Sequence, residues 1–273
     1  MLKQDTSQFI NFIVGRQALW MKKELGGPAP WSDDPVYARA KINNCFRRQD
    51  RFTKFELSKI DGLPFEEQVF RILIARHAIS ESMFNLMEPK KKLTAADING
   101  LRSKIGSGND FIGVCILFPN KAGFKREDRV LEHYHTVLKT YKMFAKKILG
   151  LSSAQEVVDL IRRTYPCLGP FRSYEVYTSL TYCPDFKFTE DDYLFIGPGS
   201  KDVMLDYLDV KNPGLKEAKE LATIIGAQLK KAGCYIPGGH FTVRMLEDSF
   251  CEFRKYTKAR LTGKPSKIYR GAK

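Results

Sequence analysis

Hydrophobic positions along this chain recur mostly at the three- and four-residue spacing of an amphipathic helix. The pattern is strongest over residues 126–149, where apolar side chains repeat along one face from Val130 to Ile148. It also predicts a helix over residues 7–24, with two glycines just after its end. Further helices are predicted over residues 49–60, 65–87, 94–104, 152–165, 171–182, 200–208, 215–231 and 243–261. The sequence therefore predicts a mainly helical (mainly α) fold.

One segment has a different pattern. Residues 113–118, Gly-Val-Cys-Ile-Leu-Phe, are the only segment that the pattern predicts as a plausible strand. A short buried helix would give the same pattern. Turns rich in proline and glycine join the helical segments, and a natural division falls near Gly150. We expect one helical lobe over residues 1–150 and a second over residues 151–273, unless the two halves form one domain.

Composition adds a strong positive charge to this picture. The 273 residues are enough to bury a substantial core. Lysine and arginine total 45 against 31 acidic residues, a formal net charge of +14 with a pI near 9.4. Such an imbalance raises the local concentration of polyanions, so nucleic acid is the first partner to consider. A generally basic, solvated surface is the alternative.

Several classes of protein are disfavoured. No apolar run approaches the roughly 18 residues of a membrane span, and the N-terminus lacks a signal-peptide layout. We therefore expect a soluble, intracellular monomer without a membrane partner, located in the cytoplasm of a bacterial host or in a nucleus. The six cysteines form no Cys-x-x-Cys pair, which argues against a zinc ribbon or a disulfide framework.

Cofactors are not indicated either. His133 and His135 would fall on different sides of a helix, so we expect no metal site. A P-loop requires Gly, four residues and then Gly-Lys-Ser/Thr, and no such stretch occurs. The sequence gives no support for ATP use, and we expect no bound cofactor.

The strongest local motif is the turn Gly197-Pro198-Gly199, followed by Ser200 and Lys201 at the start of a predicted helix. Glycines let a ligand approach the backbone closely, and a helix N-terminus presents N–H groups that suit a phosphate. The turn resembles the hairpin of helix-hairpin-helix DNA-binding proteins, and a purely structural loop is the alternative. We predict that Gly197, Gly199 and Lys201 bind the DNA backbone.

The segment from Asn44 to Arg51 concentrates an amide, three arginines and a carboxylate. On a helix Arg47 and Arg51 would share a face, and Asp50, three residues from Arg47, could orient it. Such a group could clamp a phosphate or contact a base edge, and a solvated salt-bridge network is the alternative. We predict that Asn44, Arg47 and Arg51 bind the base or substrate and that Asp50 is catalytic.

The last predicted helix carries Glu252, Lys255 and Tyr256 and leads into a basic tail with no acidic residue beyond Arg254. Basic side chains interleaved with aromatic ones suit a nucleic-acid strand, although a disordered solubilising tail is an equally simple explanation. Lys255 and Tyr256 are therefore candidates for DNA-backbone binding. Glu252 is an unusual negative charge on this helix, which makes it a candidate general acid or base.

Five motifs, taken in order, resemble those of one family. They are Trp31-Ser32-Asp33-Asp34-Pro35, residues 44–51, Gly169-Pro170-Phe171-x-x-Tyr174-Glu175, Gly197-Pro198-Gly199 and Cys251-Glu252-Phe253-x-Lys255-Tyr256. The family is that of the phage thymine-hypermodification proteins. It includes the alpha-glutamyl/putrescinyl thymine pyrophosphorylases and the helical domain associated with 5-hydroxymethyluracil DNA kinases. The resemblance runs from about Phe9 to Tyr269.

This resemblance implies a two-lobed, DNA-glycosylase-like helical fold and action on a 5-hydroxymethyluracil-type base in DNA. Some members replace an activated pyrophosphate on the base with an amine or amino acid. The base would be flipped into a pocket between the lobes and stacked on an aromatic side chain such as Tyr174. Glu175 stands where many relatives would have glutamine, which puts an amide contact to the base there in doubt. The implied site residues are Asn44, Arg47, Asp50, Arg51, Tyr174, Gly197, Gly199, Glu252, Lys255 and Tyr256.

Three functions are compatible with these residues. The favoured one is hypermodification by substitution at the base, for which a separate enzyme would have to activate the base. The second is a DNA glycosylase that leaves an abasic site and uses Asp50 or Glu252, with Asp206 and Asp209 in reserve. The third is a non-catalytic DNA-binding module.

Overall fold

The computed structural model describes residues 5–87, 92–107 and 126–264, and every regular element within these ranges is a helix. The mainly helical prediction is confirmed, while the predicted strand at 113–118 lies outside the described residues. The chain divides into two compact units. Unit 1 combines the chain up to Asp50 with the chain from Ile196 onward, and unit 2 runs from Arg51 to Phe195. None of the described helices is both long and apolar enough to cross a bilayer.

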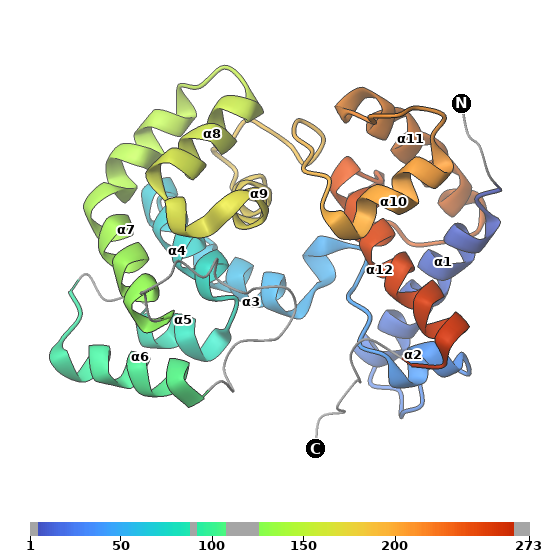
Figure 1. The fold of residues 1–273 in the computed structure, drawn as a ribbon, viewed down its shortest axis with the longest axis horizontal. Helices are drawn as coiled ribbons and strands as arrows, with labels where there is room; N and C mark the ends of the chain where they lie inside the picture. Colours follow the sequence, from blue (N-terminus) through green and yellow to red (C-terminus); the bar gives the residue numbers. More distant parts are fainter. Residues whose placement is uncertain (1–4, 88–91, 108–125, 265–273) are drawn as a thin grey trace. The chain divides into compact units, whose positions relative to one another are not determined.

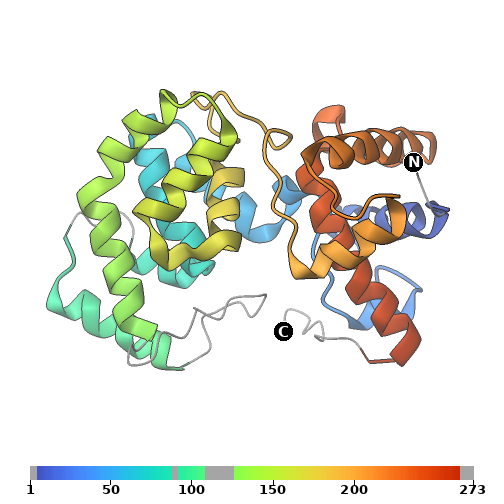
Figure 2. The ribbon, with the colours of Figure 1, turned by 45° about the horizontal axis from the view of Figure 1, so that its top comes forward.

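Unit 1 is organised around its last helix. In both views the long α12 runs alongside the shorter helices of the unit, and it packs against α1, α2, α10 and α11 (Figures 1 and 2). Aromatic rings fill the contact between α1 and α12, with the Phe9 and Phe250 centroids 4.6 Å apart. The elements are α1 (Ser7–Glu24), α2 (Pro35–Arg39), the 3-10 helix η1 (Arg47–Gln49), α10 (Pro198–Tyr207), α11 (Leu215–Lys231), η3 (Pro237–Gly239) and α12 (Val243–Thr262).

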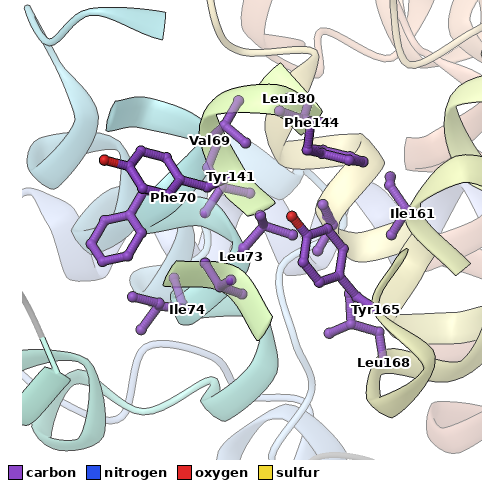
Figure 3. Packing of buried hydrophobic residues seen from close by; sticks show 14 of the residues in the cluster. Val69, Phe70, Leu73, Ile74, Tyr141, Phe144, Ile161, Tyr165, Leu168 and Leu180 are labelled. Atoms are coloured by element: carbon purple, nitrogen blue, oxygen red, sulfur yellow. The ribbon is translucent and has the colours of Figure 1, made fainter. Parts of the chain in front are cut away.

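Unit 2 is built around α4, which packs against α3, α5, α7 and α9. Figure 3 shows its apolar core, in which Leu73 of α4 lies among side chains that include Phe144 of α7 and Tyr165. The elements are α3 (Arg51–Ile60), α4 (Phe65–Ala78), α5 (Glu81–Met87), α6 (Ala95–Ser107), α7 (Arg126–Leu149), α8 (Ala154–Thr164), η2 (Pro166–Leu168) and α9 (Gly169–Leu180).

The boundary between the units differs from the expected division near Gly150. Gly150 lies in the short turn between α7 and α8, and Ile148 and Ala154 on either side of it belong to one hydrophobic core. Because the residues on both sides of this turn pack into the same core, the turn does not separate two domains. The chain instead passes between units after Asp50 and again after Phe195.

A charged group is buried in the middle of unit 2. The guanidinium of Arg76 donates to Glu56 at 2.5 Å, to Thr53 at 3.1 Å, to Ser179 at 2.7 Å and to Glu175 at 3.3 Å. The Arg76 side chain is fully buried, and those of Glu56 and Glu175 are each 1% exposed. This group, the Arg76 network, ties α3, α4 and α9 together.

Two histidines form a second buried feature of unit 2. The rings of His77 on α4 and His133 on α7 stack with centroids 4.0 Å apart. The Nε2 of His133 donates a hydrogen bond to the carbonyl oxygen of Leu73 at 3.0 Å. Burial lowers the pKa of His133 to about 4 and lowers the pKa of His77 well below its usual value. Both rings are therefore neutral at physiological pH.

Candidate functional site

The most elaborate polar cluster of unit 1 is centred on Glu252 of α12. Its carboxylate accepts from the backbone N–H of Asn43 at 2.9 Å and from the Asn43 side-chain amide at 3.3 Å. The Lys255 ammonium, one turn further along α12, donates to the same carboxylate at 2.5 Å. Glu252 is 4% exposed and both of its oxygens accept hydrogen bonds, so it fastens the loop before η1 to α12.

Arg16 of α1 stands beside this cluster, and sequence reasoning missed it. Its Nε donates to the carbonyl oxygens of Ile42 and Asn43, each at 3.1 Å, and its Nη1 is buried without a hydrogen-bond partner. Burial lowers the pKa of Arg16, and nearby acidic groups that include Glu252 and Asp50 oppose that effect. The two predicted catalytic carboxylates, Asp50 and Glu252, therefore both raise the pKa of the same guanidinium.

A signal for Arg16 was present in the sequence. It follows the buried residues Phe12 and Ile13 by four and three positions, which places a charged side chain on the apolar face of α1. A charge at such a position needs buried partners. Here those partners are the carbonyl groups and acidic side chains of the loop after α2 and of α12.

The predicted helix over residues 49–60 is interrupted at Asp50, which separates the site residues of the segment from Asn44 to Arg51. Asp50 has an extended backbone (φ −63°, ψ 138°) between η1 and α3. Arg47 therefore lies on η1 in unit 1, whereas Arg51 opens α3 in unit 2 and pairs with Glu81 at 2.9 Å. The predicted shared helix face of Arg47 and Arg51 is wrong for this reason.

Asn44 has an internal role in the structure. It is buried, its side-chain oxygen accepts from the Phe46 N–H at 2.8 Å, and its amide donates to Gln49 at 3.2 Å. The neighbouring Asn43, which sequence analysis did not select, is the residue that contacts Glu252. Asp50 is half-buried at the end of η1, so it is the more accessible of the two predicted catalytic carboxylates.

Tyr174 and Glu175 lie in the interior of unit 2. Tyr174 is 1% exposed, and its ring packs against those of Tyr193 and Phe195. These contacts leave no open face of Tyr174 for the predicted stacking of a base within unit 2. Glu175 belongs to the Arg76 network, and an acidic side chain at this position is explained by its contact with the Arg76 cation.

The tryptophan-containing motif and Tyr256 meet in unit 1. Asp34 caps α2 by accepting from the Val36 and Tyr37 N–H groups, and its other oxygen accepts from the Tyr256 hydroxyl at 2.6 Å. The Tyr256 ring stacks on Tyr37 with centroids 5.0 Å apart. Tyr256 is buried by these contacts, so the structure gives it a packing role rather than exposure to a DNA backbone.

The Gly-Pro-Gly turn begins α10, with Gly197 as the N-terminal cap. Residues 181–196 separate this turn from α9, so it is not a short hairpin between two helices. A Cβ at Gly199 would lie 2.9 Å from the Cys251 sulfur on α12. Ser200 is buried and donates to Glu247 at 2.7 Å, while Lys201 is exposed. Gly199 is therefore needed for the close packing of α10 on α12.

We expect Gly199→Ala to lower the free energy of unfolding by about 1 kcal/mol, because overpacking forces neighbouring atoms apart. The double variant Gly199→Ala/Cys251→Ala should recover that loss, since removing the sulfur makes room for the new methyl group. Chemical denaturation of the two proteins tests this. An unchanged stability of Gly199→Ala would show that the glycine is not required for packing.

The positive charge is unevenly divided between the units. The sequence of unit 1 contains 23 lysines and arginines against 13 acidic residues, a net +10 of the chain's +14. Within the described ranges, no three histidine, cysteine or acidic side chains are grouped in a way that could hold a metal ion. The reserve carboxylates Asp206 and Asp209 are exposed, the first on α10 and the second just after it.

Comparison with known proteins places the chain in one class. It belongs to the family described as 5-hmdU DNA kinase, helical domain, whose model matches residues 4–264. This confirms the resemblance to the phage thymine-hypermodification proteins. The chain is similar to the 5-hmdU DNA kinase of Bacillus phage SP10, with 23% identity over 281 residues, covering 91% of this chain and 44% of that protein. The chain thus spans less than half the length of this relative. No solved structure gives a significant match.

Proposed function

We propose that the chain binds DNA and acts on a 5-hydroxymethyluracil-type base within it, as part of the hypermodification of that base. Family membership over nearly the whole chain is the observation that carries this proposal. The phage relative is named for the same modified nucleoside. The net +10 of unit 1 adds support, because a strong positive field favours a polyanionic partner.

The proposed chemistry is substitution at the exocyclic carbon of the base. An amine forms a bond to that carbon, the bond to an activating pyrophosphate breaks, and a carboxylate accepts the proton lost by the amine. Asp50 is the better candidate for that carboxylate, because it is only half-buried, whereas both oxygens of Glu252 are engaged. The base would have to leave the duplex stack, at a cost of a few kcal/mol.

A non-catalytic DNA-binding module is the second candidate. Two predicted site residues, Glu252 and Tyr174, are committed to contacts inside their units, which favours a binding role for the chain. Excision of the base, and the DNA-glycosylase-like architecture on which it depends, remain further proposals. The position of Gly197 at the end of a long connection gives the helix-hairpin-helix interpretation little support.

One experiment separates these functions. Duplex DNA containing 5-hydroxymethyluracil, either plain or pyrophosphorylated on the base, is incubated with the protein and with glutamate or putrescine. Substitution gives a new nucleoside mass on an intact strand, and excision gives strand cleavage after hot alkali. A chain that binds this DNA and yields neither product is a binding module.

If substitution occurs, we expect Asp50→Asn to reduce its rate by about 100-fold or more, the range for loss of a general base. DNA affinity should remain unchanged within about twofold. Glu220→Gln, which removes an exposed carboxylate on α11 of the same unit, is the matched control and should retain full activity. A wild-type rate in Asp50→Asn would show that Asp50 is not the general base. It would not affect the assignment of the chain to its family.

A further inference from the structure

An open pocket of about 480 Å³ lies on unit 2, where α8 ends and α9 begins. Its lining residues are Asp159, Arg162 and Arg163 of α8, Pro166 of η2, and Gly169 and Pro170 of α9. The volume is within the range of small-molecule sites. The pocket includes the first two residues of the motif that continues to Tyr174 and Glu175, for which the function proposed above gives no role.

Two guanidinium groups supply the positive charge of this pocket. Arg162 and Arg163 occupy the last turn of α8, and both side chains are exposed. Neither forms an ion pair in the part of the chain that the structure describes. Arginine suits phosphate because its planar donors can bind two oxygens at once and because it is weakly hydrated. Asp159 is the one acidic lining residue, so the lining carries a net charge of +1.

The start of α9 adds a second source of positive potential. No side chain caps its first turn, and that turn contains no acidic residue. Gly169 has a φ of +64°, and apart from its chain neighbours and the backbone of its own helix no atom lies within 4 Å of the position that a Cβ would take there. The partial positive charge of this twelve-residue helix is therefore open to the pocket that Gly169 and Pro170 line.

We infer that this pocket binds a phosphate group through Arg162, Arg163 and the N-terminus of α9. The source is either a phosphodiester of the DNA backbone or a free phosphate, such as inorganic phosphate or pyrophosphate. The chemistry at the pocket is the same for both. The DNA source rests on the proposed function, whereas binding of a free phosphate does not.

The test compares two double variants, each of which neutralises two positively charged side chains. Arg162→Gln/Arg163→Gln removes the pocket cations. Lys146→Gln/Lys147→Gln removes two adjacent exposed cations from the last turn of α7, also in unit 2 and outside the pocket. Affinity for unmodified duplex DNA is measured between 50 and 300 mM KCl by fluorescence anisotropy. Thermal stability is measured with inorganic phosphate and with KCl of equal ionic strength.

If the pocket holds a backbone phosphodiester, the arginine variant should bind DNA at least tenfold more weakly at 50 mM KCl. Its slope of log affinity against log salt should fall by about one unit, because one phosphate contact of the DNA backbone is lost. The lysine variant should keep the wild-type slope. If the source is a free phosphate, DNA binding is unaffected, and inorganic phosphate raises the melting temperature of the wild type but not of the arginine variant.

The inference is overturned if the arginine variant matches the wild type in both measurements. In that case the wild type can still bind DNA, so the proposed function survives. If the wild type shows no DNA affinity, the proposed function fails instead. The measurement with inorganic phosphate then tests phosphate binding by the pocket independently of DNA.

Discussion

Replacing Arg76 with methionine is expected to lower the free energy of unfolding by about 3–5 kcal/mol. The carboxylates of Glu56 and Glu175 would remain buried without the cation that they contact at 2.5 and 3.3 Å. Leaving charge uncompensated in a protein interior has a cost of this size. Urea denaturation, monitored by far-ultraviolet circular dichroism, measures the loss.

Two control proteins identify the cause. Arg76→Met/Glu56→Gln/Glu175→Gln removes the whole charged network and should recover most of the lost stability, because neutral amides are cheaper to bury. Arg51→Met breaks an ion pair whose arginine side chain is 86% exposed, and it should change stability by less than about 1 kcal/mol. Equal losses in Arg76→Met and Arg51→Met would contradict the argument.

Acid should destabilise unit 2 through its stacked histidines. Because the pKa of His133 is about 4 in the folded protein and near 6.5 when unfolded, the unfolded chain binds the proton more tightly. Its contribution to stability is complete above pH 6.5 and is lost as the pH falls toward 4. Between pH 7.5 and pH 5 this loss amounts to about 2 kcal/mol for His133, and His77 acts in the same direction.

The double variant His77→Phe/His133→Gln isolates this effect. Its free energy of unfolding should change less between pH 7.5 and pH 5 than that of the wild type, by about 2 kcal/mol or more. His135→Gln, which replaces an exposed histidine on the same helix, should keep the wild-type dependence. A double variant with the full wild-type dependence would assign the acid sensitivity to other groups.

Periodicity predicted the long helices well, because their apolar faces are continuous. The bounds of α1, α7 and α11 agree with the predicted ranges. The two errors within helices have local causes. The predicted helix over 65–87 is broken at Ile79, whose φ of 47° is rare for a branched side chain. The helix over 49–60 is broken by the extended backbone of Asp50.

The candidate site was only partly predictable. Residue type pointed to Glu252 and Asp50, and both act on Arg16 in the structure. Asn43 contacts Glu252 across 209 positions of sequence, a pairing that only the tertiary fold creates. Tyr174 and Tyr256 have the residue type of base-stacking groups, but burial decides their role, and a helical pattern does not show which polar aromatic lies inside.

The interrupted course of unit 1 has a consequence for its biosynthesis. Its α1 must pack against α11 and α12, and the whole of unit 2 is made between them. At the usual 5–20 residues per second, the apolar face of α1 with Phe9 and Phe12 waits on the order of ten to fifty seconds for these partners. Unit 2 is continuous in sequence and has no such delay. Synthesis of unit 1 therefore begins before that of unit 2 and ends after it.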